Sequence, residues 1–180
     1  MNREQTLQAV LHITKLPPVI AEKITDDFIN FNPLQKSTSL SEIEKAFNKA
    51  SNPGFDAFSF RQVILNHYGL DKKTSSIVAN SFRSRAGCMR SLSVSKDSGY
   101  SRCQWEFRVT CISVNRDAHE KYSKEYFLIK EGLKMPHGIT MPGIEFGCNC
   151  DVRIVIEEPQ PVQKTSKRWL SRLMDIFLRK

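Results

Sequence analysis

Residues 71–111 read DKKTSSIVANSFRSRAGCMRSLSVSKDSGYSRCQWEFRVTC, and the spacing of their apolar side chains changes part-way along. Up to about Lys96 the apolar side chains recur every three or four residues, which predicts one long helix with Asp71 as its N-cap. After Gly99 the period falls to two, which predicts a strand with one buried face and makes the chain an α+β protein. The apolar positions of this strand are Cys103, Trp105, Phe107, Val109 and Cys111.

Residues 1–70 are predicted to form a helical subdomain whose short helices are separated by proline and asparagine. Pro17 and Pro18 open a second helix, and Ser39 or Ser41 can cap a third because each is followed three residues later by a glutamate. A fourth helix is expected from Phe58 to Tyr68, with Gly69 as its left-handed C-cap. The expected core positions of the first three helices are Leu7, Val10, Leu11, Val19, Ile20, Ile24, Phe28, Phe31, Leu40, Ile43, Phe47 and Ala50.

Residues 71–158 are predicted to form the α+β part, with a small antiparallel sheet packed against the long helix. A second strand is expected at Val152–Ile156, and a short helix or strand at Tyr122–Lys130. Residues 159–180 are predicted to form a linker and a basic amphipathic C-terminal helix, which could dock in a partner's groove, lie on an anionic membrane surface or fold back on its own domain. Its apolar stripe, the candidate partner-binding site, is Trp169, Leu170, Leu173, Met174 and Phe177.

Composition limits the classes of protein to consider. The chain has 180 residues, of which 40% are hydrophobic and 26% charged, so wholesale disorder is excluded. It has no apolar run of the roughly 18 to 20 residues that a membrane-spanning helix needs, and its first ten residues lack the apolar core of a secretory signal, so a cytoplasmic origin is expected. The five cysteines are odd in number and clustered, which favours reduced thiols or a metal over a disulfide scaffold.

The net charge of +8 comes from two segments of the chain. Residues 83–116 hold seven basic and two acidic side chains, and residues 164–180 hold six basic side chains and one acidic. A localised basic excess attracts polyanions, so non-specific contact with DNA is one interpretation and a solvated helix face is the other. The candidate nucleic-acid-binding residues are Arg83, Arg85, Arg90, Arg102 and Arg108.

The segment 119–150 contains a possible zinc site. Cys148 and Cys150 form a Cys-x-Cys pair beside a glycine, and such a pair can offer two thiolates to one metal. His119 and His137 are the candidate nitrogen ligands, and Cys103 or Cys111 could complete a tetrahedral set. The alternative is that these cysteines are small buried hydrophobic residues at a tight turn.

No enzyme motif is convincing. In the zinc deaminases the catalytic glutamate follows the ligand histidine by two positions and the thiols are spaced Cys-x-x-Cys, whereas here Glu120 is adjacent to His119 and the pair is Cys-x-Cys. A nucleophilic pair such as Cys148 with His119 can be drawn from almost any chain with this many cysteines and histidines. We therefore predict a protein without enzymatic activity, with a hydrolytic toxin as a remaining possibility.

The order of motifs from residue 77 to residue 156 is more specific than any one of them. IVANSFRSRAGCMRSLSVS is followed by DSGYSRCQWEF, NRDAH, EGLKMP and PGIEFGCNCDVRIVI. This order resembles the C-terminal domain of the phage Mu F-like head morphogenesis proteins, which are related to the minor head protein of phage SPP1. The residues that match the family's characteristic positions are Trp105, Asp117, His119, Pro142, Gly143, Cys148 and Cys150.

The resemblance implies a minor capsid protein of a phage or prophage. Its expected partners are capsid, portal or scaffold proteins, with non-specific contacts to DNA, and its expected location is the bacterial host cytoplasm and the capsid interior of the virion. The alternative is a small zinc-stabilised nucleic-acid-binding protein or a toxin-like effector delivered by a phage.

Overall fold

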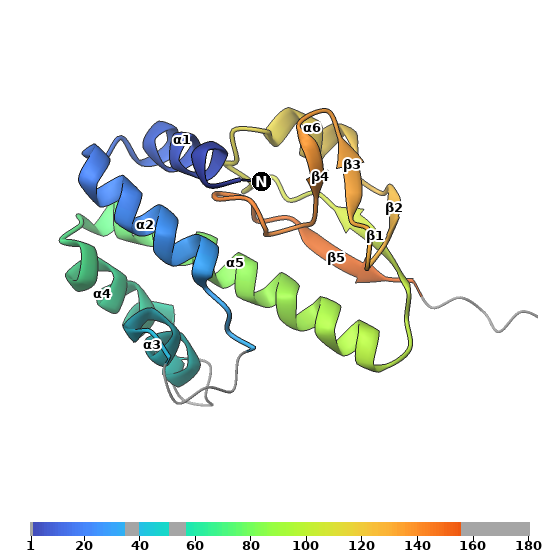
Figure 1. Ribbon diagram of the computed structural model, residues 1–180, viewed down its shortest axis with the longest axis horizontal. Helices are drawn as coiled ribbons and strands as arrows, with labels where there is room; N and C mark the ends of the chain where they lie inside the picture. The colour runs from blue at the N-terminus through green and yellow to red at the C-terminus, as the bar shows by residue number, and fades with distance from the viewer. Residues whose placement is uncertain (1, 35–39, 51–56, 156–180) are drawn as a thin grey trace, which may run out of the picture.

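The computed structural model describes residues 2–34, 40–50 and 57–155, which fold into a helical layer and a small sheet joined by one long helix (Figure 1). The α+β class is confirmed. The helices are α1 (Arg3–Thr14), α2 (Pro18–Asn30), α3 (Glu42–Ala50), α4 (Ala57–Tyr68), α5 (Lys72–Asp97) and α6 (Arg116–Lys121). The strands are β1 (Arg102–Glu106), β2 (Tyr126–Leu128), β3 (Leu133–Met135), β4 (Gly138–Thr140) and β5 (Asp151–Ile154).

The local signals that predicted the helix ends are present in the structure. The Asp71 side chain accepts hydrogen bonds from the backbone N–H groups of Lys73 and Thr74 at 2.7 and 3.0 Å, so it caps α5 as expected. Ser41 and Glu44 exchange side-chain-to-backbone hydrogen bonds at the start of α3, as in a capping box. Gly69 has a φ of 66°, the left-handed conformation that ends α4.

Helix α5 contributes to two hydrophobic cores. Its first half presents Val78 and Phe82 to the helical core, where the Phe82 ring meets the Phe28 and Phe31 rings edge-on at 5.3 and 5.0 Å. Its second half presents Leu92 to the core beneath the sheet. The long helix is therefore a shared wall, with α1–α4 around one half and the strands beside the other (Figure 1).

The main sheet has three antiparallel strands in the order β2-β1-β5. In β1 the buried side chains are Cys103 and Trp105, which pair with Phe127 of β2 and Val152 of β5 respectively. Strands β3 and β4 form a separate hairpin that sequence periodicity did not predict. The expectation of a small antiparallel sheet is confirmed.

The first strand ends earlier than its apolar alternation predicted. β1 stops at Glu106, Val109 is 79% exposed, and the Cys111 N–H donates to the Arg108 carbonyl in a turn. The Arg116 guanidinium donates to the carbonyls of Val109 and Cys111, so a side chain satisfies them in place of a neighbouring strand. This turn moves Cys111 out of the sheet.

Three other expectations have different outcomes. Val19 is exposed, because Ala21, Ile24 and Phe28 define the buried face of α2 and Val19 lies on the opposite side of the helix. The segment expected to be a short helix or strand contains β2, and α6 precedes it. The C-terminal helix and its stripe of Trp169, Leu170, Leu173, Met174 and Phe177 lie outside the described residues. Among the described helices, none has the length and apolar character needed to cross a bilayer.

Candidate metal centre

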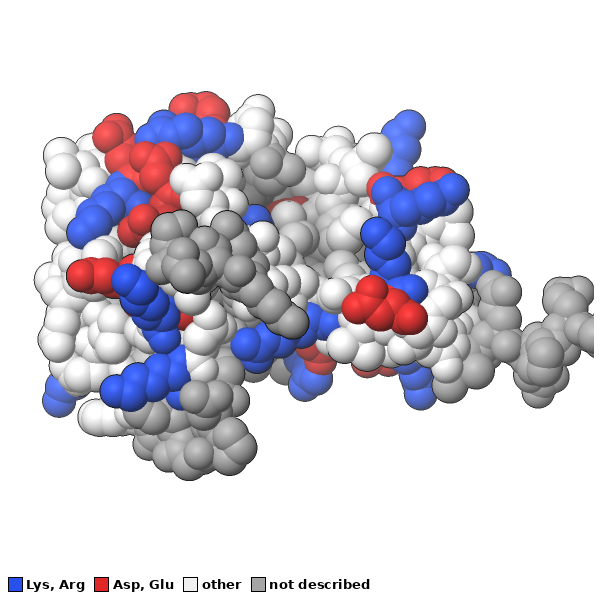
Figure 2. Space-filling model, turned by 60° about the horizontal axis from the view of Figure 1, so that its bottom comes forward, with Lys and Arg blue, Asp and Glu red and all other residues white. Residues whose placement is uncertain are grey.

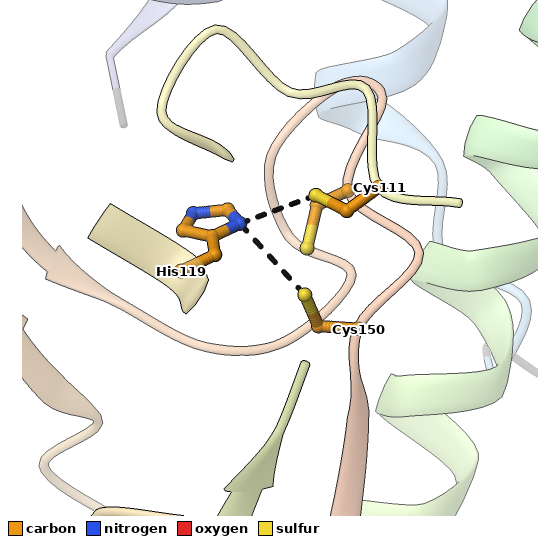
Figure 3. Close-up of side chains that lie close together, drawn as sticks. Cys111, His119 and Cys150 are labelled. Carbon is orange, nitrogen blue, oxygen red and sulfur yellow. Dashed lines mark hydrogen bonds between the residues drawn. The ribbon is translucent and has the colours of Figure 1, made fainter. Parts of the chain in front are cut away.

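Four buried side chains from three separate segments converge at one point of the β-rich part. Cys111 comes from the turn after β1, His119 from α6, and Cys148 and Cys150 from the loop before β5. Their donor atoms all lie within 4.8 Å of one another. Figure 3 shows the His119 ring directed at the sulfurs of Cys111 and Cys150.

Two nitrogen-to-sulfur distances are close to the edge length of a tetrahedral site. His119 Nδ1 lies 3.5 Å from Cys111 Sγ and 3.9 Å from Cys150 Sγ. With Zn–S near 2.3 Å and Zn–N near 2.1 Å, a tetrahedron places a nitrogen about 3.6 Å from each sulfur. One nitrogen and three sulfurs, all closed off from solvent, therefore fit a structural metal site.

Gly143 allows the cysteine loop to approach α5. Its φ is 71°, and a Cβ atom at this position would lie 2.6 Å from the carbonyl oxygen of Ser84 on α5. The Gly143 N–H donates to Cys148 Sγ at 3.3 Å. A glycine is required here both for its backbone conformation and for the close contact, and it positions one of the thiols.

The loop is also hydrogen-bonded to the turn that carries Cys111. The Gly147 N–H donates to the Ser81 hydroxyl of α5 at 3.1 Å, and the Gly147 carbonyl accepts from the Ile112 N–H at 2.9 Å. The Asn149 side chain donates to the Thr110 carbonyl at 3.0 Å. The three thiols are thus held by backbone and side-chain hydrogen bonds that involve α5.

A buried carboxylate stands behind the histidine ring. Glu145 is 1% exposed, and its Oε2 atom lies 3.2 Å from His119 Nε2, although the N–H is not aligned well enough for a hydrogen bond. Ser113 and Asn115 donate to the same oxygen at 3.0 Å each. A carboxylate at the second nitrogen of a ligating histidine is the usual means of fixing the ring's orientation and tautomer.

His137 lies on the far side of this carboxylate. Its Nε2 atom is 2.7 Å from Glu145 Oε1, a hydrogen-bonding distance and shorter than the roughly 3.3 Å that separates two ligands of one tetrahedral ion. His119, Glu145 and His137 are close enough to be considered as a second metal-binding group, but these distances favour a hydrogen-bonded chain. The structure therefore brings Cys111, and not His137, to the three other candidate ligands.

The series of side chains His119, Glu145 and His137 ends at a cleft of about 660 Å³. Helix α1 and the β3–β4 hairpin line the cleft, and His137 and Glu145 lie in its wall. The metal-ligand candidate His119 is itself fully buried. Solvent and small molecules in the cleft can therefore reach His137, which is half-buried.

The cluster is polarised before any metal is considered. Hydrogen bonds from Cys148 and Cys150 lower the pKa of Cys111 far below that of a free thiol, and those interactions raise the pKa of Cys148. Burial alone would lower the pKa of His119, but hydrogen bonds to Cys111 and Cys150 and the nearby charge of Glu145 raise it to about 11. Burial would likewise raise the pKa of Glu145, yet His119 and Asn115 hold it well below its ordinary value. A pocket that stabilises a thiolate and a carboxylate favours a cation.

The five candidate nucleic-acid-binding arginines share neither one surface nor one role. Arg85 points inward, where its guanidinium donates to the carbonyls of Ile29 and Ile144 at 3.2 Å each and lies over the Phe28 ring. Arg108 forms an ion pair with Asp151. Both side chains therefore bind partners within the protein.

The other three arginines are more available to solvent or to stacking. Arg83 is exposed on α5, while the Arg90 and Arg102 guanidinium groups lie 4.9 and 5.3 Å from the centroids of the Phe47 and Tyr126 rings. Figure 2 shows basic side chains in several places on one face of the molecule, separated by acidic and uncharged surface. In this view the basic side chains of the described residues form no single continuous band.

Two residues of the site had weak signals in the sequence. Cys111 was one of four options for completing the site beside Cys148 and Cys150, and His137 was preferred to it, because the turn that redirects Cys111 is not visible in an alternating pattern. Glu145 was not singled out, because a lone glutamate between Ile144 and Phe146 gives no sign that it is buried. Trp105 and Gly143 adjoin the cluster, whereas Asp117 is exposed in the first turn of α6.

Comparisons with protein-family models, curated proteins and solved structures find no match for the chain.

Proposed function

We propose that Cys111, His119, Cys148 and Cys150 hold a structural zinc ion. The observation that carries this proposal is the buried set of one nitrogen and three sulfurs, all within 4.8 Å of one another, with two nitrogen-to-sulfur distances near a tetrahedral edge. Three thiolates and an imidazole are the ligands of a common class of structural zinc site. Since the protein supplies all four ligands, zinc would act as a cross-link.

Zinc would join parts of the chain that have little regular structure of their own. The turn after β1, the short helix α6 and the loop before β5 each contribute a ligand to this cluster, and hydrogen bonds such as Ile112 N–H to the Gly147 carbonyl join the turn to the loop beside it. The main sheet has just three strands, each of five residues or fewer. Small cores of this kind commonly rely on a metal for stability, so removal of zinc is expected to loosen the β-rich half.

We propose further that the chain is a head morphogenesis protein of a phage or prophage. The support is spatial: Trp105, His119, Gly143, Cys148 and Cys150, which carry the resemblance to the Mu F-like family, surround the proposed zinc centre. The Trp105 and His119 ring centroids are 5.0 Å apart, and Gly143 donates to the Cys148 thiol. In this proposal the zinc-stabilised part is a rigid module that contacts capsid, portal or scaffold proteins.

The experiment for this role is incorporation into phage particles. Tagged chain is produced during lytic growth, and purified particles are probed for it. Incorporation is expected for the natural chain and is expected to be lost on Trp169→Asp or Phe177→Asp with the zinc content unchanged. Particles that lack the natural chain, or that retain both variants at natural levels, would contradict the proposal.

The alternative function is a small zinc-stabilised nucleic-acid-binding protein or a delivered effector. It shares the proposed metal centre, and the net charge of +8 favours it. The same particle experiment separates the head protein from a cytoplasmic nucleic-acid-binding protein, which would be absent from purified heads. A delivered effector would be present in the heads but dispensable for their assembly, so a deletion of the gene that leaves particle yield unchanged would favour the effector.

A further inference from the structure

We propose that the surface shared by α4 and α5 binds single-stranded nucleic acid, with a base stacked on Phe58 and phosphates held by Arg61 and Arg83. Phe58 and Arg61 were not among the candidate residues from the sequence. The inference adds a ligand site to the proposed function and does not depend on the metal centre.

A hollow of about 240 Å³ lies between the two helices at this surface. Among the described residues its lining contains two guanidinium groups and no carboxylate, so these residues present positive charge to a ligand. The lining residues are Phe58, Arg61, Ser76, Ala79, Asn80 and Arg83. A basic hollow of this size matches one nucleotide unit better than an extended protein surface.

The Phe58 ring is unusual for its exposure. It is 57% exposed, whereas Phe60 and Ile64 of the same helix are buried. The Arg61 guanidinium lies 4.9 Å from the Phe58 ring centroid, and its Nη1 atom is 3.5 Å from the Ser76 hydroxyl of α5. An exposed ring beside an arginine is a suitable platform for a base, because every base has a π-face that can stack on an aromatic side chain.

Helix α5 extends the positive surface beyond the hollow. Lys73, Asn80, Arg83 and Gly87 are exposed at spacings of seven, three and four residues, which place them on one helix face, and no acidic residue occurs in α5 before Asp97. At 1.5 Å per residue this stripe is about 20 Å long. A sugar–phosphate backbone could follow it from Lys73 past a small residue, Gly87, without meeting an acidic residue of α5.

The combination of groups favours nucleic acid over an acidic peptide. An acidic peptide would use the two guanidinium groups but would gain little from an exposed phenyl ring. Asn80 is exposed on α5 and lies between Arg61 and Arg83 in the sequence. Its side-chain amide offers a donor and an acceptor that can hydrogen-bond to the edge of a base. A stacked base must be free of a duplex, so the preferred ligand is a single strand.

The test measures the affinity of the full chain for a fluorescein-labelled twelve-residue oligothymidylate by fluorescence anisotropy. Phe58→Leu keeps the apolar bulk without the π-face and is expected to weaken binding at least about 5-fold. The pair Arg61→Gln and Arg83→Gln is expected to reduce the slope of log K against log salt by about 1.4, the value for two phosphate contacts on a single strand. The control pair Lys121→Gln and Lys134→Gln makes the same charge change on exposed residues elsewhere.

Equal weakening by the control pair, or an unchanged affinity of Phe58→Leu, would overturn the site. Competition by polyglutamate as effective as that by unlabelled oligothymidylate would also overturn it, because the surface would then recognise negative charge alone. The metal content of each variant is measured in parallel. A variant that keeps the metal content of the natural chain but loses oligothymidylate binding supports the site. A natural chain that binds oligothymidylate but contains no zinc refutes only the zinc proposal.

Discussion

The Nε2 atom of His119 lies 3.2 Å from Glu145 Oε2, while the Nδ1 atom of the same ring faces the thiols of Cys111 and Cys150. The two ring nitrogens therefore have separate roles, one toward the proposed metal and one toward a buried carboxylate. Glu145 also holds His137 through its other oxygen, so one carboxylate links the metal centre to the wall of the cleft.

Glu145→Gln should weaken zinc binding without removing a ligand. The amide would no longer provide a negative charge behind the imidazole, and the ring would lose part of its basicity and its fixed orientation. We expect a 10- to 100-fold loss of affinity, the usual effect of changing such a partner, measured by competition with a chromophoric chelator. Glu131→Gln, at an exposed site, is the matched control. Equal affinities for the two variants would show that Glu145 does not orient His119.

Gly143→Ala should destabilise the protein more than Gly99→Ala. Both glycines have positive φ, at 71° and 81°, but an added Cβ would meet the Ser84 carbonyl at position 143 and nothing within 4 Å at position 99. The backbone strain alone is of the order of 1 to 3 kcal/mol, and the clash adds to it at position 143 only. Urea unfolding of the two variants measures the difference. Equal losses would mean that the cysteine loop is not pressed against α5.

Tyr68→Phe tests the polar contact between α4 and α2. The Tyr68 hydroxyl donates to Asp27 at 2.7 Å, and burial followed by this hydrogen bond raises the pKa of Tyr68 well above 10.0. Near neutral pH the substitution should cost about 1.5 to 3 kcal/mol, as for a hydrogen bond to a charged group.

The pH dependence of this contact has a definite sign. Above pH 10 the unfolded tyrosine ionises while the folded one stays protonated, so the unfolded state binds fewer protons and stability falls as pH rises. The difference in the free energy of unfolding between the natural chain and Tyr68→Phe should therefore keep its full size below pH 10 and become smaller above pH 10. Denaturant titrations from pH 8 to pH 11 measure it, and a constant difference would contradict a buried, neutral Tyr68.

Arg85 and Arg83 should respond in opposite ways to substitution. Arg85→Met removes donors from the Ile29 and Ile144 carbonyls and should cost about 1.5 to 3 kcal/mol in the free energy of unfolding. Arg83→Met is on the surface and should change stability by less than about 0.5 kcal/mol while weakening oligonucleotide binding. Chemical denaturation and anisotropy distinguish the two. Loss of binding by a stable Arg85→Met would contradict its interior role.

The sequence was most informative where the signal is local. Asp71 and Gly69 mark helix ends through their own backbone and side-chain chemistry, so α4 and α5 were predicted within one or two residues. The end of β1 was not predictable, because it depends on Arg116 reaching back to the carbonyls of Val109 and Cys111. Alternation of apolar residues continues through that turn and therefore overestimates the strand.

The same distinction applies to the metal centre. The Cys148-x-Cys150 pair and His119 were recognisable because their residue types and spacing suit a metal. The fourth ligand and the supporting carboxylate depend on tertiary folding, since Cys111 and Glu145 reach the site only when the turn after β1 and the loop before β5 fold against α5. The β3–β4 hairpin was missed because its strands have three residues each, too few to show a period.

Elemental analysis of the purified protein and its single cysteine variants is the most direct test of the zinc centre. We expect about one zinc per chain, lost or strongly reduced in Cys111→Ser, Cys148→Ser and Cys150→Ser. Cys88→Ser and Cys103→Ser are matched controls, because both thiols are buried in the same core outside the ligand set, and they should retain the metal. Folded natural protein without metal, or equal loss of zinc in the two control variants, would contradict the proposed centre.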